Sequence, residues 1–137
     1  MAEIKENIAI FQTTGKRKKS VARLTLIANS EKKSISINGK DINEVPKWSV
    51  YKSYFLKPLI ETGNEDKFMI KINAKGGGYK GQIDSTRIAI ARALLKISPD
   101  YRTTLKVNGW LTRDDRIKWK KIFGRPKARK KWQYAKR

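Results

Sequence analysis

Polar and apolar residues alternate in three segments of the chain, which predicts three strands that each bury one face. Residues 20–27 are roughly alternating and rich in β-branched side chains, residues 34–38 alternate strictly, and residues 68–75 alternate most clearly. A short polar turn separates the first two segments, so we expect them to pair as a hairpin. After the second, Asn38 and Gly39 favour a tight turn, because both tolerate positive φ.

Apolar residues recur at helical spacing in two other segments. Between residues 43 and 56 they fall three or four positions apart, which predicts a helix that ends near Pro58. A second apolar stripe begins after residue 86 and predicts a helix that is capped by Asp84 or Ser85. Ser98–Pro99 ends this helix, because the residue before a proline avoids the helical conformation.

The elements become shorter toward the C-terminus. Residues 105–107 favour a short strand, and Thr112 followed by Asp114 and Asp115 predicts another helix start, because acids stabilise the positive end of the helix dipole. The apolar periodicity ends near Phe123, so we expect an extended tail that becomes ordered on a partner.

Strands mixed with amphipathic helices predict the α+β class. The boundaries that follow are an N-terminal extension at 1–10, a globular domain at 11–109, and a helix start with an extended basic tail at 110–137.

The charge of the chain indicates that this α+β domain has a polyanionic partner. The 137 residues include 33 Lys and Arg against 12 Asp and Glu, a formal net charge of +21. Residues 116–137 contain 11 of these cations and no acid. A surface this basic repels itself unless phosphates or similar groups neutralise it. The longest segment without charge has nine residues, far fewer than the roughly 20 that a membrane-spanning helix needs, and acids near the N-terminus argue against a cleaved targeting segment.

The residue types that are missing exclude most catalytic chemistry. The chain contains no Cys and no His, which removes disulfides, thiolate zinc sites, cysteine nucleophiles and imidazole acid–base catalysis. We therefore expect no catalytic residue, no metal, no cofactor and no small-molecule substrate.

Two basic, glycine-containing motifs are candidates for phosphate contact. Residues 14–20 carry four consecutive cations after Gly15, and a glycine would let the backbone approach a phosphate closely. Residues 75–82 join a strand to a helix through three glycines, with Tyr79 and Lys80 at the tip. The spacing matches no mononucleotide or dinucleotide motif, so contacts with RNA fit better. A solvated loop and a flexible corner are the respective alternatives.

A third candidate surrounds the adjacent acids Asp114 and Asp115. A metal or acid–base site is one interpretation, but helix capping and local ion pairing explain the two acids without chemistry, and we prefer it. The cations of the preceding helix, Arg87, Arg92 and Lys96, are equally compatible with a solvated polar face and with phosphate contacts.

Taken in order, these motifs resemble the universal small-subunit ribosomal protein nine family, in its bacterial or organellar form. The resemblance covers the chain from about Phe11 to the last residue and rests on the following segments: Thr14–Lys18 with Ser20–Arg23, Ile37–Gly39, Gly76–Gly78 with Gly81–Gln82, Ala89–Leu94, Leu111–Asp114 with Arg116, Lys120–Lys121 with Gly124, Ala128–Arg129, and Gln133–Tyr134 with Lys136–Arg137.

The resemblance implies a fold and a set of partners. The fold would be a β-α-β domain similar to the second domain of ribosomal protein five, and the globular part would bind ribosomal RNA. The partners would be the 3′ major domain of small-subunit ribosomal RNA, neighbouring proteins of the small-subunit head, and the anticodon stem-loop of the tRNA in the peptidyl (P) site, which the C-terminal tail would reach. No membrane is implied, and the location would be the ribosome in a bacterial cytoplasm or an organelle interior.

The resemblance also implies roles for single residues. Lys136 and Arg137 match the residues that approach the tRNA. Matching basic positions and the tip of the glycine loop give the expected contacts with ribosomal RNA: Lys16, Arg17, Lys18, Arg23, Lys80, Arg113, Arg116, Lys120, Lys121 and Arg129. The chain departs from the family pattern at Ala135, where a serine is usual, and at Asp115, Trp119 and Trp132.

The sequence therefore predicts a structural constituent of the ribosome without catalytic activity. The alternative is a free architectural nucleic-acid-binding protein, which would bind duplexes with steep salt dependence and no preference for ribosomal RNA.

Overall fold

The structure, a computed structural model, describes residues 9–28 and 34–136. The expected polar turn at 29–33, most of the expected N-terminal extension, and Arg137 lie outside the described residues. The elements follow one another as β1 (Ile10–Arg17), β2 (Ser20–Ala28), β3 (Ile35–Ile37), β4 (Lys40–Asp41), the 3₁₀ turn η1 (Ile42–Glu44), α1 (Pro46–Ser49), α2 (Lys52–Glu61), β5 (Phe68–Lys75), α3 (Tyr79–Ile97) and α4 (Tyr101–Val107).

The strands form one five-stranded sheet in the order β1-β2-β5-β3-β4. β2 pairs antiparallel with β1 and with β5, and β3 pairs antiparallel with β4 and parallel with β5. The connection from β3 to its parallel neighbour β5 contains α1 and α2, so the expected β-α-β unit and the α+β class are confirmed. The expected hairpin between β2 and β3 is wrong, because β5 lies between them.

Two tight turns join neighbouring strands. Lys18 and Lys19 connect β1 to β2, and Lys18 adopts a φ of 52°. Asn38 and Gly39 connect β3 to β4 with φ values of 51° and 85°, as in a type I′ turn. The predicted tight turn is therefore confirmed. The Asn38 side chain also donates to the carbonyl of Ala74 (3.3 Å) and accepts from its amide (2.9 Å), which ties this turn to β5.

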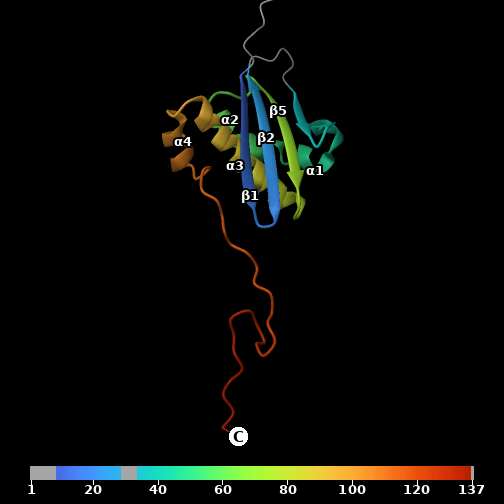
Figure 1. The fold of residues 1–137 in the computed structure, drawn as a ribbon, viewed down its shortest axis with the longest axis vertical. Helices are drawn as coiled ribbons and strands as arrows, with labels where there is room; N and C mark the ends of the chain where they lie inside the picture. Colours follow the sequence, from blue (N-terminus) through green and yellow to red (C-terminus); the bar gives the residue numbers. More distant parts are fainter. Residues whose placement is uncertain (1–8, 29–33, 137) are drawn as a thin grey trace, which may run out of the picture.

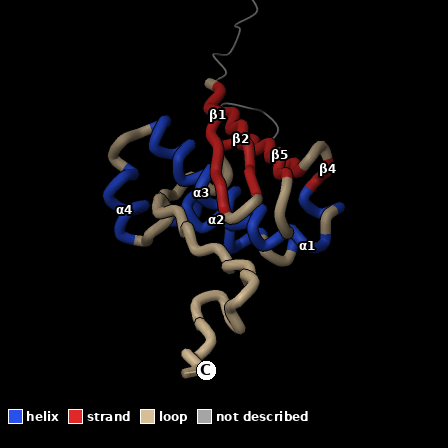
Figure 2. The backbone as a smooth tube through the Cα atoms, turned by 60° about the horizontal axis from the view of Figure 1, so that its bottom comes forward, coloured by secondary structure: helices blue, strands red, loops and turns tan. Residues whose placement is uncertain are grey.

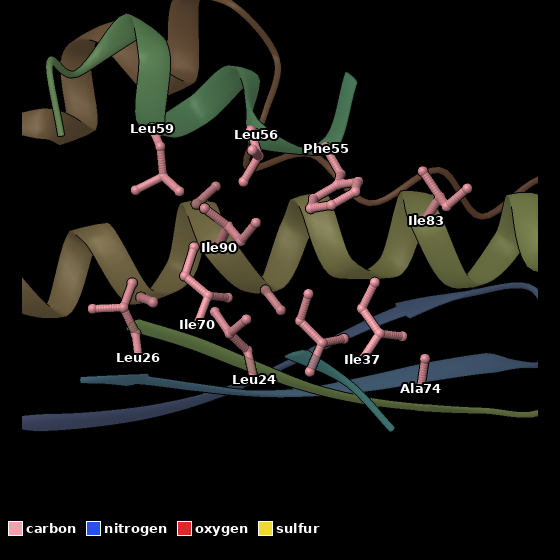
Figure 3. Close-up of a cluster of buried hydrophobic side chains, with 14 of the residues drawn as sticks. Leu24, Leu26, Ile37, Phe55, Leu56, Leu59, Ile70, Ala74, Ile83 and Ile90 are labelled. Carbon is pink, nitrogen blue, oxygen red and sulfur yellow. The ribbon is translucent and has the colours of Figure 1, made fainter. Parts of the chain in front are cut away.

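The helices lie on one face of the sheet (Figure 1), and α3 runs between the sheet and α2 (Figure 3). Leu24, Leu26 and Ile70 point from the strands toward α3, while Phe55 and Leu59 point down from α2 (Figure 3). These five side chains are at most 1% exposed. Their burial supplies most of the stabilisation in this small domain, and it leaves the opposite face of the sheet without a covering helix among the described residues.

Four of the predicted elements differ from the structure. α2 continues through Pro58 to Glu61, and α3 begins at Tyr79, so that Asp84 and Ser85 lie inside it instead of capping it. The predicted strand at 105–107 is part of α4. No helix begins after Thr112 in the described chain.

Residues 112–136 contain neither helix nor strand. The segment 112–137 is called the tail below. The tail leaves the domain beside the end of β1 and extends away from it (Figures 1 and 2), as the sequence predicted for an extended segment. Within the described residues, no helix is both long enough and apolar enough to cross a membrane.

Candidate nucleic-acid interface

Three basic motifs that are distant in the sequence meet at one end of the sheet. This end, called the hairpin end, comprises the β1–β2 turn, the glycine loop 76–78 and the start of α3 (Figure 1). The Ser20 hydroxyl donates to the carbonyl of Gly76 (3.0 Å), which holds the glycine loop against β2. The packing is tight here, since a Cβ atom on Gly77 would lie 2.1 Å from the Ser20 hydroxyl oxygen. The third motif, 111–116, reaches the same end through Arg17.

Arg17 connects the end of β1 to the start of the tail. Its Nη1 donates to the carbonyls of Asp114 and Arg116, both at 2.9 Å, and its Nη2 donates to the Asp114 carboxylate at 2.8 Å. Asp84 of α3 lies 3.8 Å from its Nε. The Arg17 side chain is only 13% exposed, so much of its hydrogen-bonding capacity is used in fixing the direction of the tail.

Asp114 is the centre of a local ion-pair cluster. Besides Arg17, its carboxylate accepts from the backbone amide of Arg116 (2.9 Å) and from the Arg116 guanidinium (2.9 Å). These side-chain and backbone hydrogen bonds from Arg116 hold the pKa of the Asp114 carboxyl far below its usual range. The neighbouring Asp115 lies 3.4 Å from Arg113. The local ion pairing predicted for the two acids is confirmed. The predicted helix cap is wrong, because no helix follows the two acids within the described residues.

A second contact fixes the chain just before the tail. The Arg87 guanidinium lies between two rings, 4.9 Å from the centre of Tyr54 and 4.8 Å from the centre of Trp110. The guanidinium donates to the Tyr54 hydroxyl oxygen (2.6 Å). The Tyr54 hydroxyl in turn donates to the Asp84 carboxylate (3.1 Å). Burial raises the pKa of the Tyr54 phenol, so this group remains a donor at neutral pH. The Trp110 indole nitrogen in turn donates to Glu61.

Most of the residues predicted to contact RNA are exposed, and several of them lie near the hairpin end. Lys16, Lys18, Lys80 and Arg113 are exposed near the hairpin end, and the Arg116 side chain is 90% exposed despite its pairing with Asp114. The remaining candidates do not gather there. Arg23 lies on the sheet face that carries no helix, while Lys120, Lys121, Arg129 and Lys136 are exposed along the tail. Arg137 lies outside the described residues.

Gly15 serves packing and not the approach of a phosphate. A Cβ atom at this position would lie 1.8 Å from the carbonyl oxygen of Ser85 and 2.9 Å from the amide of Ala89, both in α3. The residue is buried against the helix side of the sheet. The expectation that Gly15 lets the backbone approach a phosphate is therefore wrong at this face.

Sequence reasoning named Arg17 and Arg87 only as possible phosphate contacts, and it missed Tyr54, Trp110 and the exposed cations of β5. Tyr54, Arg87 and Trp110 come from three segments, and nothing in their spacing signals a common contact. Lys71 and Lys75 could have been found, because the strict alternation of residues 68–75 places them together on the exposed face of a strand. Within the described residues, no group of three or more acids could hold a metal ion.

The geometry defines a class of protein: a small α+β domain with cations gathered at one end and a long basic tail fixed there. The family described as Ribosomal protein S9/S16 matches residues 15–137, and the chain belongs to this family.

Relatives of this chain include bacterial proteins named small ribosomal subunit protein uS9. One from Mesomycoplasma hyopneumoniae is 47% identical over 127 residues, covering 93% of this chain and 95% of the relative. One from Porphyromonas gingivalis is 45% identical over 123 residues, covering 90% and 94%. One from Nostoc punctiforme is 41% identical over 138 aligned positions, covering 100% and 99%. The family predicted from the sequence motifs is confirmed.

Proposed function

We propose that the protein is a structural constituent of the small ribosomal subunit and binds small-subunit ribosomal RNA without any catalysis of its own. The observation that carries this proposal is the convergence of three basic motifs at the hairpin end, from which a tail with 11 Lys and Arg and no acid from residue 116 onward departs. Family membership supports it, since relatives of similar length carry the name of a small-subunit protein.

The RNA contacts in this proposal are electrostatic. Lys16, Lys18, Lys80 and Arg113 present ammonium or guanidinium groups from a packed end of the domain, while Arg23 does so from the sheet. Each cation that neutralises a phosphate releases condensed counterions, so binding weakens as salt rises. Arg17 and Arg116 contribute mainly by directing the tail, and Lys120, Lys121 and Arg129 continue the contacts along it. The RNA partner is the 3′ major domain, beside neighbouring proteins of the subunit head.

The end of the tail has a distinct role in this proposal, which is to reach the anticodon stem-loop of the P-site tRNA. Lys136 is exposed and, with Arg137, offers two adjacent cations to a tRNA phosphate. Ala135 precedes them and provides no hydroxyl group, so charge is the means of contact. The protein would act in the ribosome of a bacterial cytoplasm or an organelle interior.

Sedimentation tests the ribosomal assignment. A tagged full-length chain in a salt-washed lysate should migrate with small subunits at near-stoichiometric amounts. Release at moderate salt, or migration with bulk DNA or RNA, would overturn this assignment and favour a free architectural nucleic-acid-binding protein.

Removing Lys136 and Arg137 tests the role of the tail end. We expect subunits to assemble normally, because the contacts that fix the tail lie more than 20 residues upstream at Asp114. Retention of tRNA in the P site should fall, as measured by filter binding to isolated subunits. A K130Q/K131Q variant removes two adjacent cations in the middle of the tail and serves as the matched control. Equal loss in both variants, or failed assembly of the truncated protein, would contradict this role.

A further inference from the structure

The face of the sheet opposite the helices carries a second group of cations on rigid strands. Alternation along β2 and β5 directs Arg23, Lys71 and Lys75 to this face, while Leu24, Ile72 and Ala74 point to the core. All three cations are exposed. Among the described residues, those directly opposite these cations on neighbouring strands are neutral.

The strand register brings these cations together. Arg23 lies opposite Asn73 of β5 and opposite Thr14 of β1. Lys71 and Lys75 precede and follow Asn73 by two residues on the same strand, so the two lysines are about 13 Å apart at the usual rise per residue. Arg23 thus faces the midpoint of this pair from the next strand, and the three cations surround a single asparagine.

α3 extends the basic surface around the edge of the sheet. Arg92 donates to the carbonyl of Thr14 (2.7 Å), and Lys96 donates to the carbonyl of Gln12 (2.8 Å), both on β1. β1 is an edge strand whose outer carbonyls would otherwise need water. These hydrogen bonds hold the two side chains at the rim of the sheet, although both residues remain exposed.

The surface is hollowed, which distinguishes it from a flat solvated face. An open depression of about 1230 Å³ lies over it. Its lining includes all five cations, Arg23, Lys71, Lys75, Arg92 and Lys96, together with neutral amides and hydroxyls such as Gln12, Thr25 and Asn73. None of the described residues that line it carries a carboxylate or an aromatic ring.

This chemistry fits a sugar–phosphate backbone. Cations suit phosphates, amides and hydroxyls suit ribose hydroxyls, and the absence of aromatic rings in the lining leaves no platform for stacking single bases. We propose that the open face of the sheet binds the backbone of folded, double-helical RNA through Arg23, Lys71, Lys75, Arg92 and Lys96. This surface adjoins the hairpin end at Lys75, which directly precedes the glycine loop, and it does not include the tail. The inference rests on the proposed function because it extends the RNA surface of the same protein beyond the hairpin end.

A pair of double variants tests the surface directly. K71Q/K75Q removes two cations from the depression, and R102Q/K106Q removes two exposed cations from α4, which does not line it. Both change the net charge by the same amount. Binding of the full-length chain to a transcript of small-subunit ribosomal RNA is measured between low and moderate salt, after equal thermal stability has been checked.

The expected result is that the slope of log affinity against log salt becomes shallower by about two for K71Q/K75Q and by less than about 0.5 for R102Q/K106Q. Equal changes in the two variants would mean that only net charge matters and would overturn the inference.

Lysine acylation of salt-washed subunits separates this inference from the proposed function. We expect slower acylation, by several-fold, in subunits than in the free protein at three lysines of the surface: Lys71, Lys75 and Lys96. Their reactivity should return after ribonuclease treatment. Lys106 serves as the reference lysine. Reactive Lys71 and Lys75 in intact subunits would overturn the sheet surface and leave the ribosomal assignment intact. Protection that survives ribonuclease would also overturn it, because a protein neighbour would then cover the face. Failure of the chain to enter subunits would instead overturn the proposed function.

Discussion

At the scale of single residues, Arg17 decides where the tail begins. It lies among four consecutive cations in the sequence, yet its guanidinium is turned inward to Asp84 and Asp114 while its neighbours are exposed. Three hydrogen bonds from one side chain reach residues 114 and 116. Arg17 thus fixes the direction in which the tail leaves the domain, although it is one of four consecutive cations in the sequence.

Replacing Arg17 with alanine should release the start of the tail without unfolding the domain. The three hydrogen bonds to residues 114 and 116 are lost, so hydrogen exchange at the Arg116 amide, which donates to the Asp114 carboxylate, should accelerate on the order of tenfold. Exchange in α3 and β5 should change little. NMR-detected exchange gives the rates residue by residue.

Arg92→Ala is the matched control for this prediction, because Arg92 also donates to a backbone carbonyl but lies away from the tail. Unchanged exchange at the Arg116 amide in Arg17→Ala, or the same acceleration in both variants, would show that Arg17 does not hold the tail.

Gly15 is the second residue whose effect exceeds its size. β1 approaches α3 so closely that an added Cβ would meet a backbone carbonyl, which cannot rotate away as a side chain can. Gly15→Ala should therefore lower the free energy of unfolding by about 1–3 kcal/mol, the usual range for overpacking. Urea unfolding followed by circular dichroism measures this difference.

Gly78→Ala is the control for Gly15→Ala, because an added Cβ at Gly78 meets nothing within 4 Å and its φ is not in the left-handed region. We expect a change below about 1 kcal/mol there. Equal losses in the two variants would mean that contact with α3 is not the cause.

At the scale of elements, the contact between β1 and α3 explains why the pattern of apolar residues did not predict β1. The residues of β1 that face α3 include Thr13 and Gly15, which are not large apolar residues, because the helix backbone lies so close. The Thr13 hydroxyl donates to the carbonyl of Ala89 at 2.7 Å, in place of an apolar contact. A strand with this composition shows no hydrophobic alternation, so its partner β2 was assigned to the wrong neighbour.

The predicted start of α3 and the predicted end of α2 were wrong for related local reasons. Gly81 in the first turn of α3 has low helix propensity and hides the true start, yet an added Cβ there would lie 2.7 Å from the Ser20 hydroxyl oxygen. Pro58 suggested an end to α2, but buried Leu59 follows it and keeps the helix packed on α3. In contrast, β5 was predicted with its bounds, because its alternation of buried and exposed residues is complete from Ile70 onward. Pattern therefore predicted elements whose burial is one-sided and missed those shaped by close backbone contact.

The candidate site divides in the same way. Exposed cations such as Lys18 and Lys80 could be named from the sequence, since charge on a turn or loop tip remains in solvent. The contact of Arg87 with Tyr54 and Trp110 could not be predicted, because it depends on how α2, α3 and the chain after α4 pack together.

At the scale of the whole molecule, stability and charge reside in different parts. The buried core extends from Ala22 to Leu105, and the large apolar side chains of the tail, including Trp119, Phe123 and Trp132, are more than half exposed. The tail beyond Arg116 is therefore expected to add almost nothing to folding. It carries ten of the 33 Lys and Arg and none of the acids, so removing residues 117–137 lowers the net charge from +21 to +11.

Truncation after Arg116 should thus separate folding from binding. We expect the melting temperature to change by less than about 2 °C, because the deleted residues bury no core side chain and the contacts of Arg17 with residues 114 and 116 are retained. Affinity for small-subunit ribosomal RNA should fall, and its salt dependence should become shallower, because fewer phosphates are neutralised. Calorimetry and salt-titrated filter binding measure the two effects on the same preparation.

Each of the two measurements has an outcome that would contradict the assignment of folding to the domain and of RNA binding largely to the tail. A large drop in melting temperature would mean that the tail packs on the domain, whereas unchanged salt dependence would mean that the domain alone supplies the contacts with RNA. Because the truncated chain keeps the hairpin end and the open sheet face, whatever binding remains should be sensitive to K71Q/K75Q. Loss of that sensitivity would assign the remaining affinity to the hairpin end, where Lys16, Lys18 and Lys80 are the next cations to replace.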